Sequence, residues 1–240
     1  MNSKILSATL LIASTAMTHN ATAADTTGLS GSGELGYSSS SGNTDNQSLY
    51  GKLSLNYTQT GYEILSLLEA TQREENGSTT EERYLLDTQG NIFYNATRDY
   101  YSFIGARFEK NQFANIDLDS TYSLGMGKKL INTETMTFAG EAGVGYQTTD
   151  FTVGDSDNQT VAKLKLDFGY QVNSNVKLSQ NLMTWIGDQN TKYEANSALK
   201  VKMTDAMKVS LAYKYRHNTD PAIGVEKTDN ETLLTLIYDF

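Results

Sequence analysis

Cysteine is absent from this chain of 240 residues, and histidine occurs only twice. Without thiols the protein has no disulfides, no cysteine nucleophile and no zinc site built on cysteine. His19 falls in an N-terminal segment that we expect to be removed, which leaves His217 as the one histidine of the mature chain. A hydrolase that uses a histidine base would therefore need His217.

Basic residues and long apolar runs are also scarce. The chain has 19 lysines and arginines against 28 aspartates and glutamates, a formal net charge of −9. Nucleic acids attract lysine and arginine through their phosphates, so this balance predicts no nucleic-acid partner. After residue 23 the sequence has no run of about 18 apolar residues, the length that a membrane-spanning helix needs.

The first 23 residues have the parts of an export signal in the right order. Lys4 supplies the positive charge, residues 5–17 form the apolar stretch, and Ala21 and Ala23 are the small residues of a cleavage site. The alternative is a short buried helix. We expect cleavage after Ala23, export from the cytoplasm, and a single domain formed by residues 24–240.

Alternation of apolar and polar residues with a period of two recurs through most of the remaining chain, which predicts β-strands. In the stretch "TKYEANSALKVKM", Tyr193, Leu199 and Val201 alternate with Lys192 and Lys200. The runs span about 10 to 13 residues, which matches a tilted strand that crosses a bilayer better than the shorter strands of globular proteins. The predicted strands lie near residues 31–38, 47–58, 61–72, 82–94, 99–110, 117–130, 135–148, 158–172, 175–187, 191–203, 206–218 and 228–240.

The breaks between these runs alternate in kind. The tight turns are residues 59–61, 95–98, 132–134, 173–175 and 204–206. The mostly longer and more polar breaks are residues 38–46, 73–82, 111–116, 149–158, 188–190 and 219–227. Outer-membrane barrels have short periplasmic turns, longer extracellular loops and an even number of strands, and closure leaves no unpaired edge in lipid. The pattern predicts an all-β fold: a closed antiparallel transmembrane barrel of about twelve strands, with both termini periplasmic.

Aromatic residues near the ends of the runs agree with this prediction. They fit the girdles that barrels place at the two membrane interfaces. The residues concerned are Tyr37, Tyr57, Tyr62, Tyr94, Tyr100, Tyr146, Phe168, Tyr170, Tyr193, Tyr213, Tyr215 and Tyr238. The competing architecture is a soluble β-sandwich, which would have shorter strands and an apolar inner face.

The stretch "GSGELGYSSSSGNTDNQSLYGKLSLNY" resembles the start of a family described as salt-induced outer membrane proteins, the YdiY-like family of unknown function. The marker is a first strand that ends in Gly-Tyr, followed by the loop Ser41-Gly42-Asn43-Thr44. The stretches "YYSFIGARFEKNQF" and "YSLGMGKKL" resemble that family's middle strands. The resemblance implies a barrel in the outer membrane of a Gram-negative bacterium and implies no catalytic site.

If the apolar face of each strand contacts lipid, the opposite face lines the barrel interior with unevenly distributed charge. The later strands supply a basic wall: Lys163, Lys165, Lys177, Lys192, Lys200, Lys202, Lys208, Lys214 and Arg216. The earlier strands supply an acidic wall: Asp87, Asp117, Asp119 and Glu141. The runs at 61–72 and 99–110 fit either phase. The inward placement of Glu63, Glu69, Arg107 and Glu109 therefore stays open.

Three functions follow from this arrangement. Opposed charged walls can line a water-filled pore for small polar solutes or ions, because patches of charge set selectivity in pores. Alternatively, the charges pair across a narrow lumen and leave a non-conducting structural barrel that supports the envelope under stress. Twelve strands fall between a filled barrel of about eight and an open channel of about 16. The third function is a hydrolase that uses His217, although its parity with Tyr213 and Tyr215 points it outwards.

We expect no cofactor and no metal. The acids of "GDSDN", Asp155 and Asp157, lack the spacing of an EF-hand, and no glycine-rich stretch has the form of a phosphate-binding loop. The expected partners are outer-membrane lipid and lipopolysaccharide, with periplasmic chaperones and the barrel assembly machinery during biogenesis. The oligomeric state stays open.

The final stretch "TLLTLIYDF" keeps the alternation to its last residue. Leu236, Tyr238 and Phe240 share one face with Thr232 and Leu234. In a closed barrel the last strand pairs with the first, so we expect no frayed tail. The ending also resembles the C-terminal aromatic signal by which outer-membrane barrels are recognised for assembly. We therefore predict that Leu236, Tyr238 and Phe240 form that signal.

Overall fold

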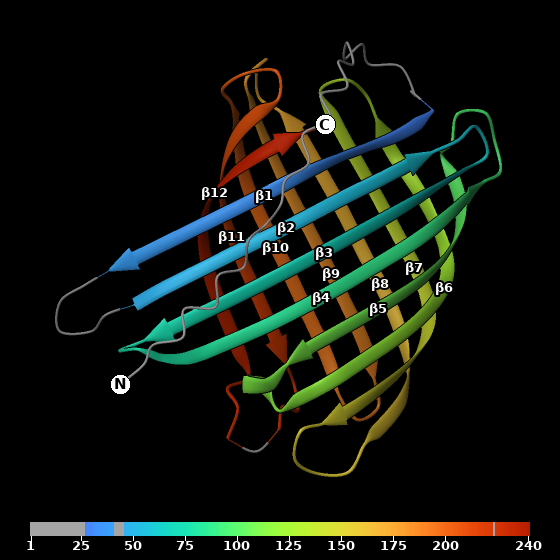
Figure 1. Ribbon diagram of the computed structural model, residues 1–240. Helices are drawn as coiled ribbons and strands as arrows, with labels where there is room; N and C mark the ends of the chain where they lie inside the picture. The colour runs from blue at the N-terminus through green and yellow to red at the C-terminus, as the bar shows by residue number, and fades with distance from the viewer. Residues whose placement is uncertain (1–26, 41–45, 223) are drawn as a thin grey trace.

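A computed structural model describes residues 27–40, 46–222 and 224–240, and these residues form one closed antiparallel β-barrel (Figure 1). Its twelve strands confirm the predicted fold class and strand number. The strands are β1 (Gly28–Ser40), β2 (Asn46–Thr58), β3 (Tyr62–Glu75), β4 (Ser78–Phe93), β5 (Tyr100–Asn111), β6 (Ile116–Asn132), β7 (Met136–Phe151), β8 (Asp157–Gln171), β9 (Val176–Gly187), β10 (Thr191–Lys202), β11 (Met207–Asn218) and β12 (Thr228–Asp239). A 3₁₀ turn, η1 (Gln112–Ala114), precedes β6.

Each strand pairs with its neighbours in sequence, and β12 pairs with β1 to close the ring. The first and last strands therefore begin and finish at the same end of the barrel, at the top of Figure 1. We call this the terminal end and the opposite end the distal end. Residues 41–45, which contain the whole loop Ser41-Gly42-Asn43-Thr44 that resembles the family's first loop, lie outside the described residues.

One predicted loop is strand instead. Residues 73–82 were expected to be a long polar loop, but β3 continues to Glu75 and β4 begins at Ser78. The two residues between them, Asn76 and Gly77, have φ angles of 51° and 75°. Left-handed conformations at both positions are those of a tight hairpin turn, for which Asn-Gly is the favoured sequence. The correction places Arg73 and Glu81 opposite each other within the sheet.

The barrel reverses the usual distribution of apolar residues. Outward-facing side chains such as Ile104, Leu124 and Leu234 keep 60–69% of their surface exposed. Buried side chains point into the barrel, among them the aromatic cluster of Phe93, Tyr101 and Phe103. An apolar outer band around a closed sheet is the surface that contacts lipid tails in outer-membrane barrels.

Glycines on β6 make room for the interior aromatic rings. A Cβ atom on Gly127 would overlap the ring of Tyr101, and one on Gly125 would lie 2.7 Å from Phe103. The Tyr101 hydroxyl donates a hydrogen bond of 3.0 Å to Glu141, which fixes the ring in place. Large side chains of β5 therefore fill space that small residues of β6 leave open.

We expect Gly127→Ala to destabilise the barrel by about 1–3 kcal/mol, the usual cost of overpacking a filled interior. Gly33→Ala is the matched control, because no atom of the residues that the structure describes lies within 4 Å of a Cβ at that strand position. The measurement is urea unfolding, followed by the fluorescence of the single tryptophan, Trp185. Equal stability of the two variants would contradict the packing argument.

A charged layer across the lumen as candidate functional site

The structure places all residues of the predicted basic wall at inward positions of β8, β9, β10 and β11. Successive cross-strand partners fix this side, for example Lys163 with Trp185, Trp185 with Lys192 and Lys192 with Asn218. The wall is not a continuous surface of free cations. Lys163 is buried, whereas Lys177 and Lys202 are exposed near the terminal end.

Three of the four residues of the predicted acidic wall also point inwards: Asp87, Asp119 and Glu141. Asp117 does not, and its assignment to the lumen was wrong. The register of β6 shifts between Ile116 and Leu118, so the parity of the strand does not extend to Asp117. Its carboxylate is exposed and bonds Lys110 at 3.0 Å on the barrel rim.

The register of the sheet shows which residues of β3 and β5 point inwards, a question that the sequence left open. Lys52 on β2 pairs with Glu69, and Asp87 on β4 pairs with Arg107. These pairings place Glu63 and Glu69 of β3, and Arg107 and Glu109 of β5, on the inner face.

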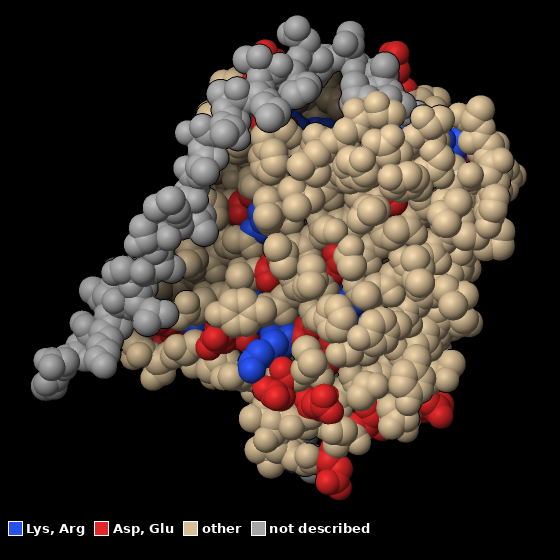
Figure 2. All heavy atoms as spheres, turned by 45° about the vertical axis from the view of Figure 1, so that its right-hand side comes forward, with Lys and Arg blue, Asp and Glu red and all other residues tan. Residues whose placement is uncertain are grey.

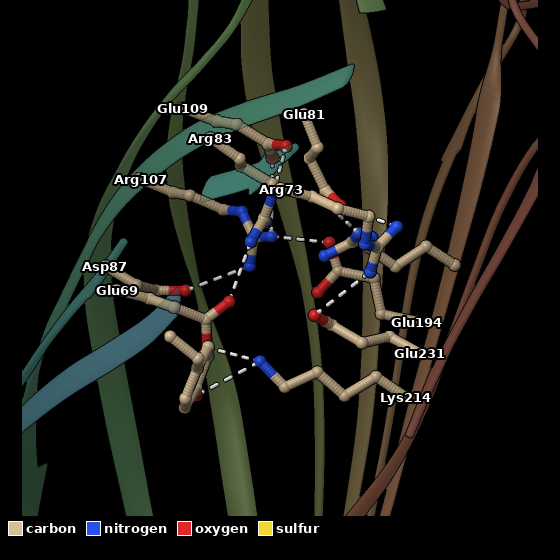
Figure 3. Close-up of polar contacts among 12 residues, drawn as sticks. Glu69, Arg73, Glu81, Arg83, Asp87, Arg107, Glu109, Glu194, Lys214 and Glu231 are labelled. Carbon is tan, nitrogen blue, oxygen red and sulfur yellow. Dashed lines mark hydrogen bonds and ion pairs between the residues drawn. The ribbon is translucent and has the colours of Figure 1, made fainter. Parts of the chain in front are cut away.

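Arg83 on β4 is the most deeply buried cation of the interior, with 3% of its side chain exposed. Its guanidinium bonds Glu69 at 2.8 Å and Glu109 at 2.7 Å (Figure 3). Beside it, Arg107 bonds Asp87 at 3.2 Å and also reaches Glu194 of β10. This last ion pair crosses the lumen, because β5 and β10 lie on opposite sides of the ring.

Two further groups of ion pairs also cross the lumen. Glu81 of β4 bonds Arg216 of β11 at 3.0 Å across the lumen, and it also bonds Arg73 of the neighbouring strand β3 at 3.0 Å. Arg73 in turn reaches Glu231 of β12 at 3.5 Å. On the terminal side, Lys214 of β11 bonds Glu69 of β3 at 2.6 Å. We call the whole set the charged layer: Glu69, Arg73, Glu81, Arg83, Asp87, Arg107, Glu109, Glu194, Lys214, Arg216 and Glu231.

The charged layer separates two cavities. A cavity of about 670 Å³ lies on its terminal side and is lined by Asp87, Lys165 and Lys214 among others. A second cavity of about 930 Å³ opens at the distal end and is lined by Lys192, Asp157 and Asp229 among others. Glu194 and Arg216 line both cavities. These two residues are therefore where the two spaces come closest.

A second barrier stands beside the layer, around Lys163. Its ammonium group lies 4.3 Å from the ring centre of Phe103 and 5.4 Å from that of Trp185. It donates a hydrogen bond of 2.7 Å to Gln89 and lies 3.3 Å from Glu141. Cation–π contacts and a paired carboxylate satisfy a charge that would otherwise be costly to bury. This side of the lumen is filled by side chains.

Lys192 adds one more bridge, because it bonds Asp119 of β6 at 2.7 Å. Lys165 instead pairs locally with Asp167 of the same strand at 2.9 Å. The residues that sequence reasoning missed as members of the site are Arg73, Glu81, Arg83 and Glu231. The Asn-Gly turn at residues 76–77 was the signal that would have placed Arg73 and Glu81 in strands.

His217 lies on the outer face of β11 at the distal end. Its ring stacks near Tyr215, with the ring centres 6.3 Å apart, and lies 6.1 Å from Tyr193. Its Nδ1 atom is 2.8 Å from the Thr228 hydroxyl. His217 is therefore outside the charged layer. Among the residues that the structure describes, no group of three or more His, Asp or Glu side chains is arranged to hold a metal ion.

Fold and lining together define the class of protein: a twelve-stranded barrel of the outer-membrane type whose lumen is crossed by ion pairs. Residues 33–240 match the family described as "Protein of unknown function, DUF481", and the chain belongs to this family. This confirms the family resemblance.

Two known proteins illustrate the relationship. The protein YdiY of Escherichia coli (strain K12) is 24% identical over 206 residues, which cover 85% of this chain and 80% of that protein. The COG4313 outer membrane channel from Pseudomonas putida F1 superposes with a TM-score of 0.55 at 12% identity, covering 90% of this chain and 97% of that chain. At this identity the channel shows that the fold is shared.

Proposed function

We propose that the protein is a small outer-membrane pore for small polar solutes or ions, and that the charged layer is its constriction. The observation that carries the proposal is the pair of cavities, which approach the layer from opposite ends and share Glu194 and Arg216. Charged side chains at the narrowest point of a pore act on every solute that passes. The proposed role is not enzymatic, since His217, the histidine that a hydrolase would need, has the same outward parity on the sheet as its partner Tyr193.

In this proposal the terminal end faces the periplasm and the distal end faces the outside. The apolar outer band contacts lipid, and the distal rim contacts lipopolysaccharide. Residues 1–23 direct export and are cleaved after Ala23. The antiparallel connections bring the start of β1 and the end of β12 to one end, and we propose that this shared end is the periplasmic one.

A non-conducting structural barrel is the second candidate, and a specific observation favours it. The ion pairs Arg107–Glu194, Arg216–Glu81 and Arg73–Glu231 all bridge strands that are not neighbours. If these pairs are permanently closed, the lumen is a salt-bridged interior without a path. The two candidates differ in one measurable quantity, the ionic conductance of the purified protein in a planar bilayer.

We expect the double variant Glu194→Ala, Arg216→Ala to conduct several-fold more current than the natural protein. Both side chains lie between the two cavities. Their removal leaves no partner unpaired, because Arg107 still bonds Asp87 and Glu81 still bonds Arg73. The matched control is Lys110→Ala, Asp117→Ala, which also removes one charge of each sign but at the exposed rim.

Discrete current steps in the natural protein, larger steps in the Glu194/Arg216 variant and unchanged steps in the control would support the pore. A folded barrel that is silent in all three forms would overturn the pore in favour of the structural barrel. An equal increase in current in both double variants would show that the charged layer is not the constriction of the pore.

A further inference from the structure

Lysines gather at the terminal mouth of the lumen. In the register of the sheet, Lys177 of β9 is directly opposite Lys200 of β10, and Lys202 of β10 is directly opposite Lys208 of β11. Lys52 of β2 lies near the same group, because it is one of the cations that act on Lys200. Like charges opposite each other destabilise a sheet unless something of opposite sign compensates them.

Acidic side chains compensate only part of this cluster. Lys202 bonds Asp205 at 2.8 Å, Lys208 bonds Asp239, and Lys52 bonds Glu34. Among the described residues, Lys177 and Lys200 have no carboxylate within bonding distance.

The surroundings of Lys200 explain why this excess of positive charge matters. Lys52, Lys177 and Lys208 repel its ammonium group, and Glu34, already bonded to Lys52, attracts it. Lys200 is half-buried, so water screens these charges less than it does on a free surface. A bound anion would relieve the repulsion.

The same row of the sheet offers a further donor. Ser210 of β11 is directly opposite Lys200 in the register. Ser210 is 1% exposed, and within the described part of the chain its hydroxyl has no hydrogen-bond partner. A buried polar group without a protein partner is uncommon and is a candidate donor or acceptor for a ligand or a water molecule. Lys177, Lys200 and Ser210 therefore form a contiguous row of donors that, among the described residues, no carboxylate bonds.

We propose that Lys177, Lys200 and Ser210 form an anion-binding site at the terminal mouth, for a small solute that carries phosphate or carboxylate groups. The site faces the lumen, so its ligand is a free solute rather than a lipid headgroup of the surrounding bilayer. The opposite, distal end gathers acidic side chains instead, as Figure 2 shows at its lower end, and Asp157, Asp220 and Glu226 line the cavity there. Anions are thus favoured at one mouth only.

Binding to this site needs no current through the barrel. A role of the site in choosing which solutes pass rests on the proposed pore. The experiment is therefore a binding measurement, isothermal titration calorimetry on the full folded barrel in a neutral detergent at low ionic strength. The probes are tripolyphosphate and succinate, which supply the two anionic groups, and glycerol serves as the uncharged probe.

We expect tripolyphosphate and succinate to bind and glycerol not to bind. The double variant Lys177→Gln, Lys200→Gln should lose at least tenfold in affinity. The matched control, Lys202→Gln, Lys208→Gln, removes the same charge from the next row of the same mouth and should lose much less. No binding to the natural protein, or an equal loss in both variants, would overturn the site.

A second measurement keeps the proposal testable if a variant does not fold. In the natural protein, tripolyphosphate should protect Lys177 and Lys200 from an amine-acylating reagent, as read by mass spectrometry, and should leave the rim residue Lys110 reactive. Equal labelling of Lys177 and Lys200 with and without the anion would also overturn the site. If the barrel conducts no current but still binds the anion, the proposed pore is overturned and the anion-binding site is supported.

Discussion

Replacing Arg83 with methionine is expected to destabilise the barrel by about 3 kcal/mol, the lower part of the range for breaking a buried ion pair. The side chain is 3% exposed and bonds two carboxylates, so its loss leaves Glu69 and Glu109 undercompensated. The effect stays at the lower limit because Lys214 still bonds Glu69, and Arg107 lies 3.6 Å from Glu109.

The measurement is equilibrium urea unfolding with Trp185 as the fluorescent probe. Lys110→Met is the control, because its ion pair with Asp117 is solvent-exposed and should contribute no more than about 1 kcal/mol. Adding Glu109→Met to Arg83→Met should recover part of the lost stability, since it removes one of the two stranded carboxylates. If Arg83→Met and Lys110→Met lose equal stability, the charged layer contributes no more to the stability of the barrel than an exposed ion pair does.

The direction in which each charged side chain points could be predicted from sequence for most strands. Alternation has a period of exactly two residues in a strand, so one lipid-facing residue fixes all the others. The rule failed where the strand is irregular. Asp117 lies at the register shift of β6, between Ile116 and Leu118, and nothing in its immediate sequence marks the shift.

The partners of the inward charges could not be predicted in the same way. Arg107 and Glu194 are 87 residues apart, and Arg73 and Glu231 are 158 apart. Their contact depends on the width of the barrel and on the stagger of all strands between them, which are properties of the closed ring. Opposed walls could be predicted from the sequence, but the inward positions of Arg73 and Arg83 were missed and that of Arg107 stayed open. These cations turn the acidic wall into a mixed surface that pairs across the lumen.

The barrel closes at the pairing of β1 with β12, which we call the seam. This pairing is shorter than the pairing of β1 with β2. Its register runs from Ser32–Asp239 to Gly36–Thr235, whereas β1 pairs with β2 along its whole length. Phe240 extends the seam by one pair. Its N–H donates to the carbonyl of Gly31 at 2.9 Å, and its carbonyl accepts from the Gly31 N–H at 2.8 Å. Its ring covers Gly31, where a Cβ atom would lie 2.7 Å from the ring carbons.

Deleting Phe240 is therefore expected to reduce the folded barrel in membranes to a small fraction of the natural amount. Phe240→Ala should have an intermediate effect, because it keeps the two backbone hydrogen bonds and loses only the ring. Folded protein is measured by its heat-modifiable mobility on gels. Tyr170→Ala is the control, since it removes another exposed aromatic side chain near the terminal end.

Refolding of the same purified variants into detergent separates two physical causes. If Phe240 acts mainly by closing the seam, the deletion should slow or prevent refolding in detergent as well as in cells. If Leu236, Tyr238 and Phe240 form a recognition signal for the assembly machinery, Phe240→Ala should refold normally in detergent and fail only in cells. Natural amounts of folded barrel from the deletion variant in both settings would refute both causes, because neither the seam nor the signal would then depend on this residue.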